Sequence, residues 1–424
     1  MRILMIGINY APEETGIGPY TAGFAEHLVG LGHKVEVVTG LPHYPQWRVA
    51  REHRGRRRRS EVVAGVRVSR GWHYVPPRQS ALRRALYEAT FLGTALFASR
   101  HKKPDVVIGI VPSLSGAVAA AVVGFGRRAP YGIVFQDLMA PAATESGIAG
   151  GRRVAGITAR VEGFVTRRAA AVAAVSPGFL PSLERYGAPR GRVFIVRNWA
   201  RIDAPEVDRA ETRARLGWPP DETVVVHAGN MGMKQGLEAV IAAGRRVDAE
   251  RLPIRFVLLG DGSQRARLTE LAGGIQAVTF ADPVPERELL GYLRAADVLL
   301  VCERPTVSTM SMPSKLTSYF LAGRPVLAAV DAAGTTAAEV RRAGAGLVTS
   351  ATDPDELVAA VRRLQADHTL AAELGAAGRA YVEAELRPER ALRDAAAFVA
   401  AIASNGVVSS PTGDGIPSAP ETMP

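Results

Sequence analysis

The stretch Thr223–Ala243 constrains the fold of this chain more than any other. It reads as a buried β-strand over residues 224–228, a turn that contains Gly229 and Gly232, and a helix with its apolar side chains on one face. The first turn of such a helix offers unpaired backbone N–H groups and a partial positive charge, and Lys234 adds a full charge there. We therefore predict that this turn holds an anion such as a phosphate group. The alternative is a turn that only connects the strand to the helix.

Strands and helices alternate along the whole chain. It begins with an apolar strand over residues 2–8, a loop rich in Pro and Gly, a helix over about 20–31 and a second strand over 34–39. This order is the βαβ start of a doubly wound parallel sheet. The alternation is repeated from residue 223 onward, so we predict an α/β protein with two Rossmann-like domains.

The length and composition set the domain plan. A chain of 424 residues with 47% hydrophobic content has room for two packed cores. The Pro-containing segment 199–222 marks the hinge between a first domain, 1–200, and a second domain, 201–385. We expect a final helix over 386–403 to cross back to the first domain, and the Pro/Ser/Gly/Thr-rich residues 404–424 to be disordered.

Several features predict a cytoplasmic protein. The single cysteine, Cys302, excludes an internal disulfide, and a buried structural thiol is a better interpretation than a nucleophile. We expect no signal peptide, because the apolar start at 3–8 is short and lacks a cleavage site. Residues 106–126 carry no charge over about the length that crosses a bilayer, but their β-branched start and Pro–Ser turn predict a strand, a loop and a helix instead of a membrane span.

The net charge of +11 is unevenly distributed. Residues 1–200 hold 28 Lys and Arg against 12 Asp and Glu, a net +16, whereas the rest holds 24 against 29, a net −5. A basic half favours an anionic membrane surface or a nucleic acid, and no recognised nucleic-acid module appears in the sequence. Arginines flank an apolar helix over 81–99, which predicts either an interfacial amphipathic helix or a core helix with a solvated charged rim.

Short motifs follow one another in a characteristic order along both halves. In the first half they are Asn9-Tyr10-Ala11-Pro12-Glu13, Thr15-Gly16-Ile17-Gly18, Pro42-His43-Tyr44-Pro45, Gln136-Asp137-Leu138 and Asn198-Trp199; in the second they are the Lys234 turn, Gly260-Asp261-Gly262, Met312-Pro313-Ser314-Lys315-Leu316 and Gly323-Arg324-Pro325-Val326. Over about residues 1–403 the chain resembles family 4 glycosyltransferases of the GT-B architecture, in which two Rossmann-like domains face a central cleft. Within that family it is similar to the subgroup typified by the colanic acid fucosyltransferase.

This resemblance implies a retaining hexosyltransferase that acts in cell-surface polysaccharide biosynthesis. It would move a hexosyl group, with a 6-deoxyhexosyl group as one candidate, from a nucleotide-diphosphate sugar to a lipid-linked or polysaccharide acceptor at the inner face of the cell membrane. Two alternatives stay open. A non-hydrolysing nucleotide-sugar epimerase would form product without an acceptor, and a non-catalytic nucleotide-sugar-binding partner of an assembly complex would show no turnover.

The resemblance also assigns roles to single residues on the donor side. Lys234 would bind the diphosphate, and Lys315 and Asp137 would be further catalytic residues. The donor would contact residues of both domains, namely Gly16, Gly18, Gln136, Gly229, Asn230, Gly232, Gly260, Asp261, Gly262, Pro313, Ser314 and Ser318.

The acceptor side is expected in the first domain. Residues 41–60 are predicted to form a long loop, with His43, Tyr44 and Trp47 near its head as candidate acceptor contacts. A histidine in a Pro-rich loop also fits a packing or capping role.

Two positions near the expected donor depart from the family pattern. Gln136 stands where related enzymes often carry a histidine, and Asn230 stands where many pair an arginine with the lysine. Lys315 is our candidate for the missing positive charge, and an exposed lysine at a helix start is the alternative.

The glutamate pair of the family is also replaced, by Met310 and Ser318. This change would weaken the contact with the ribose diol, and Glu303 would serve near the sugar only if its loop turned inward. The one Asp-x-Asp motif, Asp353-Pro354-Asp355, opens a predicted helix, so that capping explains it better than metal binding. We therefore expect a metal-independent enzyme without a cofactor.

Overall fold

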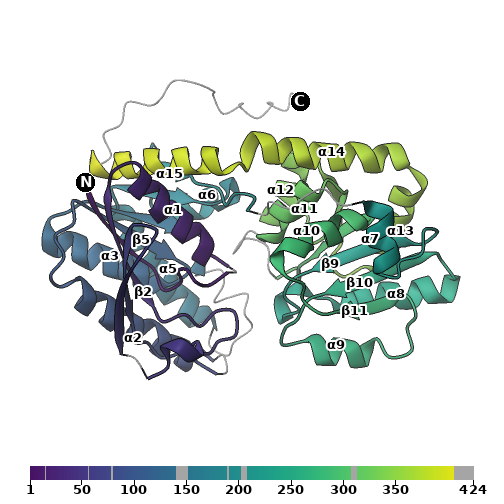
Figure 1. Ribbon diagram of the computed structural model, residues 1–424, viewed down its shortest axis with the longest axis horizontal. Coiled ribbons are helices and arrows are strands. Elements are labelled where there is room, and N and C mark those ends of the chain that lie inside the picture. The colour runs from purple at the N-terminus through teal and green to yellow at the C-terminus, as the bar shows by residue number, and fades with distance from the viewer. Residues whose placement is uncertain are drawn as a thin grey trace.

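The computed structural model describes residues 1–14, 16–55, 57–77, 80–139, 151–188, 191–201, 208–306 and 313–404. Two α/β units lie side by side in it, each built on its own sheet, and a pair of consecutive helices runs along both (Figure 1). The predicted disordered tail falls almost entirely outside the described residues.

The first sheet has eight strands in the order β3-β4-β2-β1-β5-β6-β7-β8. They are β1 (Arg2–Ile6), β2 (Lys34–Gly40), β3 (Arg58–Val63), β4 (Val66–Gly71), β5 (Val106–Val111), β6 (Tyr131–Phe135), β7 (Ala171–Ala174) and β8 (Val193–Ile195). All neighbours pair in parallel except β3 and β4. The chain leaves β1 toward β2 on one side and later places β5 on the other, so the carboxyl ends of β1 and β5 form a topological switch point, where such sheets bind ligands.

Helices cover both faces of this sheet. The helices α2 (Ala81–Ser99), α3 (Leu114–Arg127), α5 (Gly151–Arg168) and α6 (Leu180–Arg185) pack on one face, and α1 (Gly18–Gly30) and the C-terminal α15 (Pro388–Ala403) pack on the other. The strand β5 and the helix α3 occupy residues 106–126, so the prediction of a strand, a loop and a helix there is confirmed. Within the described part of the chain, no helix has both the length and the apolarity needed to span a bilayer.

The predicted loop over 41–60 ends earlier than expected, because its last three residues belong to a strand. The segment also contains a short 3-10 helix, η1 (Arg51–His53), and from Arg58 onward it forms β3, an edge strand that makes an antiparallel hairpin with β4. The two turn residues, Ala64 and Gly65, both have positive φ, 47° and 79°, which suits a tight two-residue hairpin. Charged residues such as Arg58 and Arg59 mask the strand in the sequence, because they blunt an exposed sheet edge rather than pack in a core.

The second sheet has six parallel strands in the order β11-β10-β9-β12-β13-β14. They are β9 (Thr223–Ala228), β10 (Ile254–Leu259), β11 (Val278–Ala281), β12 (Val298–Cys302), β13 (Val326–Ala329) and β14 (Gly346–Thr349). On one face lie α8 (Glu238–Glu250), α9 (Arg265–Leu271) and α13 (Pro354–Ala366); on the other lie α10 (Glu286–Ala295), α11 (Lys315–Ala322), α12 (Thr335–Ala343) and α14 (His368–Glu385). The switch point of this sheet lies between the carboxyl ends of β9 and β12.

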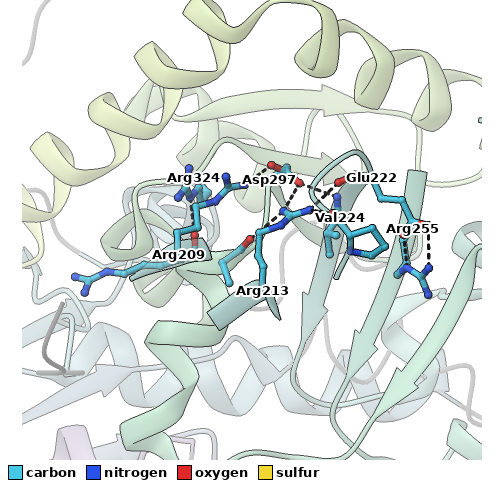
Figure 2. Close-up of polar contacts among 10 residues, drawn as sticks. Arg209, Arg213, Glu222, Val224, Arg255, Asp297 and Arg324 are labelled. Carbon is cyan, nitrogen blue, oxygen red and sulfur yellow. Dashed lines mark hydrogen bonds and ion pairs between the residues drawn. The ribbon is translucent and has the colours of Figure 1, made fainter. Parts of the chain in front are cut away.

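The opposite, amino-terminal edge of the second sheet is closed by a polar network around Asp297 (Figure 2). Nη1 of Arg213 donates to Oδ2 of Asp297 at 2.8 Å, and the backbone N–H of Val224 donates to the same oxygen at 2.8 Å. Arg209 donates to the other carboxylate oxygen. Both arginines lie on α7 (Arg209–Arg215), a helix within the segment that we predicted only as a hinge. The network therefore anchors the interdomain segment to the sheet, far from the ligand edge.

Candidate active site

The glycines that end β9 and β10 bring two loops into backbone contact. Gly260 has φ of +140°, and a Cβ there would overlap with the carbonyl oxygen of Gly229. The N–H of Gly229 donates to the carbonyl of Leu259 at 2.8 Å. Gly262 has φ of +157°, and a Cβ on it would lie 2.6 Å from the carbonyl oxygen of Met231. These close approaches explain why glycine is needed at both positions.

The polar side chains of these loops shape the turns. The carboxylate of Asp261 accepts a hydrogen bond from the N–H of Gly262 at 2.7 Å. The amide group of Asn230 lies between the two loops, with Nδ2 at 2.9 Å from a Cβ built on Gly232 and Oδ1 at 2.6 Å from one built on Gly262. The short, neutral side chain at Asn230 therefore fills the space between the loops and brings no charge to the site.

Lys234 lies on a 3-10 helix, η3 (Met233–Gln235), and not in the first turn of the following α-helix as predicted. Gly236 takes the left-handed conformation, with φ of +59°, so it separates η3 from α8. The carbonyl oxygen of Lys234 accepts a hydrogen bond from the N–H of Arg304 at 2.8 Å, which ties the turn to the end of β12. The exposed Lys234 side chain lies within electrostatic range of Asp137 of the first domain.

Lys315 brings a second positive charge to the same turn. It begins α11, and its Nζ lies 3.2 Å from Nε2 of His227 on β9. Its Cε and Nζ both lie 3.6 Å from the place that a Cβ on Gly229 would take. Burial lowers the pKa of this lysine to about 8. The alternative of an exposed lysine at a helix start is wrong, because the side chain is half-buried beneath the glycine turn.

The remaining predicted residues of this segment lie around the start of α11. Ser314 is exposed just before the helix, Pro313 is half-buried, and Ser318 is half-buried on the helix. Met310 lies outside the described residues. Glu303, at the end of β12, is buried and its Oε2 accepts a hydrogen bond from Oγ1 of Thr336 at 2.6 Å.

Asp137 lies at the carboxyl end of β6, facing the second domain. Burial raises the pKa of its carboxyl group from 3.8 to about 6, although the positive charges of Lys234 and Arg84 pull the pKa in the opposite direction. The neighbouring Gln136 accepts a hydrogen bond on Oε1 from Nδ2 of Asn198 at 2.8 Å. Asp137 therefore lies within electrostatic range of Arg84 in the first domain and Lys234 in the second. The amide oxygen of Gln136 instead binds Asn198, next to the hinge.

The structure separates the three predicted acceptor residues. The side chain of His43 is buried; its Nδ1 lies 2.9 Å from the carbonyl oxygen of Leu41 and its Nε2 lies 3.1 Å from the hydroxyl of Tyr87. This arrangement corrects the acceptor role of His43 in favour of the packing alternative. Trp47 is half-buried and meets His43 edge to face, with ring centroids 5.9 Å apart and an interplanar angle of 69°.

Tyr44 lies at the edge of the site beside Gly16. Gly16 has φ of +69°, and a Cβ on it would lie 2.9 Å from Cε1 of Tyr44. Burial, and then the negative charge of Asp137, raise the pKa of Tyr44 above its usual value. Gly18 begins α1, where a Cβ would lie 2.9 Å from the carbonyl oxygen of Glu13. The loop after β1 and the loop after β2 thus meet beside Asp137.

Trp47 also lines an open pocket of about 410 Å³ in the first domain. Its wall combines aromatic and apolar side chains with two arginines: Trp47, Arg48, Val49, Arg54, Trp72, His73, Tyr74, Val75 and Pro77. Trp47 therefore links this pocket to the loop that carries Tyr44.

Sequence reasoning missed two residues near the site, His227 and Arg84. Arg84 lies over the ring of Tyr87, 4.7 Å from its centroid, and its charge acts on Asp137. The signal for His227 in the sequence was its position: it is a single polar residue directly after the run Val224-Val225-Val226, in a predicted buried strand.

The Asp-x-Asp motif lies away from this site. Oδ1 of Asp353 accepts hydrogen bonds from the N–H groups of Asp355 and Glu356 at 2.9 and 3.1 Å, as the N-cap of α13. The predicted capping role is confirmed.

Comparisons with known proteins identify the family of this chain. Residues 15–199 match the family model of the glycosyl transferase 4-like domain, and residues 222–367 match that of the glycosyl transferases group 1. The colanic acid biosynthesis glycosyl transferase WcaI of Escherichia coli strain K12 is 32% identical over 335 residues, which cover 76% of this chain and 82% of that protein.

Two solved structures show the same fold at low sequence identity. Sucrose-phosphate synthase from Thermosynechococcus elongatus gives a TM-score of 0.72 at 20% identity and covers 94% of this chain and 98% of that one. The Anabaena protein Alr3699/HepE in complex with UDP gives a TM-score of 0.67 at 16% identity, over 94% and 100% of the two chains. Because both halves match glycosyltransferase models and WcaI is similar over most of its length, this chain belongs to the family 4 glycosyltransferases of the GT-B architecture.

Proposed function

We propose that this protein is a retaining, metal-independent hexosyltransferase that uses a nucleotide-diphosphate sugar in cell-surface polysaccharide biosynthesis. The observation that carries the proposal is the convergence of Lys234 and Lys315 on the glycine turn after β9. A nucleoside diphosphate that leaves from a sugar gains negative charge, and two ammonium groups beside an open turn would stabilise it without a metal. The UDP complex of the similar Anabaena protein supports this class of donor.

In the proposed reaction the hydroxyl oxygen of the acceptor forms a bond to the anomeric carbon while the bond from that carbon to the phosphate oxygen breaks. The acceptor proton passes to the leaving phosphate, and the configuration at the anomeric carbon is retained. Asp137 lies opposite Lys234, so we assign it to the place where the donor sugar meets the acceptor. Tyr44 and Trp47 remain the proposed acceptor contacts, and His43 supports them from the core.

We also propose that the first domain contacts an anionic membrane from the cytoplasmic side, where a lipid-linked or polysaccharide acceptor would be presented. Three large apolar side chains of α2 are exposed, Leu82, Leu86 and Phe97. The guanidinium groups of Arg58 and Arg100 lie 5.4 and 3.7 Å from the ring centroid of Phe97. Apolar side chains surrounded by arginine fit the interface of an anionic bilayer.

A turnover assay tests the enzymatic proposal. The protein is incubated with a panel of nucleotide sugars in excess chelator, with and without membrane-extracted lipid-linked saccharides, and released nucleoside diphosphate is measured. We expect release that depends on an acceptor and survives the chelator. Conversion of the sugar without an acceptor would identify an epimerase, binding without turnover would identify a non-catalytic partner, and activity restored only by a divalent cation would refute metal independence.

A further inference from the structure

We infer that His227 is a positioning residue that holds the ammonium group of Lys315 at the glycine turn for the diphosphate of the donor. This inference rests on the proposed function. It assigns a role to a buried side chain that the motifs of the sequence do not include.

His227 occupies an unusual place for a polar side chain. It lies in the central strand β9, is 0% exposed, and follows three consecutive valines. Burying an imidazole ring is unfavourable unless its nitrogen atoms find partners. Both nitrogen atoms have one: Nδ1 lies 3.2 Å from the carbonyl oxygen of Leu300, and Nε2 lies 3.2 Å from Nζ of Lys315.

These two contacts assign the tautomer of the ring. A protonated lysine can only donate a hydrogen bond, so Nε2 accepts, and the proton of the neutral imidazole is on Nδ1, which donates to Leu300. Burial and the charge of Lys315 hold the pKa of His227 well below its usual value, in agreement with a neutral ring.

A neutral acceptor has a specific advantage in this place. A carboxylate would hold Lys315 equally well, but it would also cancel the positive charge that the diphosphate needs. The imidazole orients the ammonium group and leaves its charge available to the ligand. Nζ of Lys315 is thereby kept 3.6 Å from the Cβ position of Gly229, at the carboxyl end of the same strand.

Among the described groups around Lys315, we expect the lysine itself to be the one that titrates just above neutral pH. On β12, burial raises the pKa of Cys302 to about 12, and Glu303 is an acid whose charge favours the protonated lysine. On α11, burial raises the pKa of Tyr319 above its usual value. Loss of the His227 acceptor should lower the pKa of Lys315, because a hydrogen bond to the ammonium group stabilises its charged form.

The test is the pH dependence of nucleotide affinity. UDP and GDP are titrated into the wild type by calorimetry between about pH 7 and 9, above the last phosphate pKa of about 6. We expect the affinity of the better nucleotide to fall as the pH rises through the pKa of Lys315. In His227→Phe the midpoint of the fall should move down by about one pH unit. The affinity should then be about tenfold lower than that of the wild type near pH 9 and only about twofold lower near pH 7, since one pKa unit corresponds to a tenfold change well above both pKa values.

Three further variants separate positioning from packing. His227→Gln keeps an oxygen acceptor and should recover most of the affinity. Lys315→Arg keeps its charge over the whole range, so its affinity should be flat with pH. Tyr319→Phe removes another buried polar group of the same wall, a hydroxyl 2.8 Å from the backbone nitrogen of Ala228, and should lower stability without moving the midpoint.

Different results refute the inference and the proposed function. Wild type that binds neither nucleotide and no nucleotide sugar would refute the proposed function. Nucleotide binding with an unchanged midpoint in a folded His227→Phe, an affinity in a folded His227→Gln as low as in His227→Phe, or the same midpoint in Lys315→Arg as in the wild type, would refute the role of His227 alone.

Discussion

Nη1 of Arg197 lies 2.6 Å from Oε1 of Glu339, and this ion pair joins the last loop of the first domain to α12 of the second. Both residues are buried, and the hydroxyl of Tyr381 donates to the same carboxylate oxygen at 2.6 Å. Because Arg197 directly precedes the hinge segment, this ion pair holds the two domains together beside the hinge.

Arg197→Ala should lower the free energy of unfolding by about 3 to 5 kcal/mol, because Glu339 would stay buried without its close, buried cation and would keep only the longer contact with Arg342. Arg342 provides the matched control, since it lies 3.7 Å from the same glutamate but its side chain is 46% exposed. Arg342→Ala should cost less than about 1 kcal/mol. Urea unfolding followed by tryptophan fluorescence measures both, and equal losses in the two variants would show that burial of the first pair has no special effect.

Lys234→Ala should nearly abolish transfer without unfolding the protein, because the side chain of Lys234 is exposed. Loss of a charge-assisted hydrogen bond of about 1.5 to 3 kcal/mol predicts at least a tenfold fall in rate. Met233→Ala, in the same 3-10 helix and 50% exposed, is the control and should keep its rate. Wild-type turnover in a folded Lys234→Ala protein would remove the basis of the proposed mechanism.

Asp137→Asn should stabilise the protein at neutral pH and lower its activity. The pKa of Asp137 is about 6 in the folded protein against 3.8 as its usual value, so the folded state binds the proton more tightly. Stability therefore falls as the pH rises from about 4 to about 6, and above that the full penalty of the buried charge remains, about 1 to 3 kcal/mol. Thermal unfolding of the wild type and of Asp137→Asn at pH 4 and pH 7.5 measures this effect. The same difference in Tm between the two proteins at both pH values would contradict the prediction.

The 2′-deoxy form of the bound nucleoside diphosphate should bind only slightly less tightly than the ribo form. Ser318 stands where the family has a glutamate, and a hydroxyl is a weaker and uncharged partner for the ribose diol. Titrating the two nucleotides side by side into the wild type measures the difference in Kd. A penalty of about 1.5 to 3 kcal/mol, more than tenfold in Kd, would point to a carboxylate at the ribose, and its loss in Glu303→Gln would identify that carboxylate.

The first domain should bind vesicles that contain anionic lipid and should bind neutral vesicles less. Added salt should weaken this binding, because the Debye length is about 8 Å at physiological ionic strength. Replacing Arg57, Arg58 and Arg59 with Gln should reduce co-sedimentation, whereas the same change at Arg245, Arg246 and Arg287 of the second domain should not. Equal sedimentation with neutral and anionic vesicles would favour a solvated charged rim instead.

Local sequence was sufficient where neighbouring residues decide the structure. The valine run before Gly229 predicts β9 because a parallel strand buried on both faces needs apolar side chains throughout. The capping role of Asp353 was also predictable, since its partners lie two and three residues ahead. The family and the doubly wound fold follow from such local signals repeated in order.

Contacts between residues distant in the chain were decided only by the tertiary structure. His43 has a sequence context that suits a binding loop, but Tyr87 of α2 folds over it and completes its burial. His227 and Lys315 are separated by 88 positions and meet because β9 and β12 are neighbours at the switch point, with α11 following β12. The sequence by itself determined which residues form strands, turns and caps. Which charges share one turn depended on strand order and packing, because these interactions act over a few ångströms in space whatever the separation along the chain.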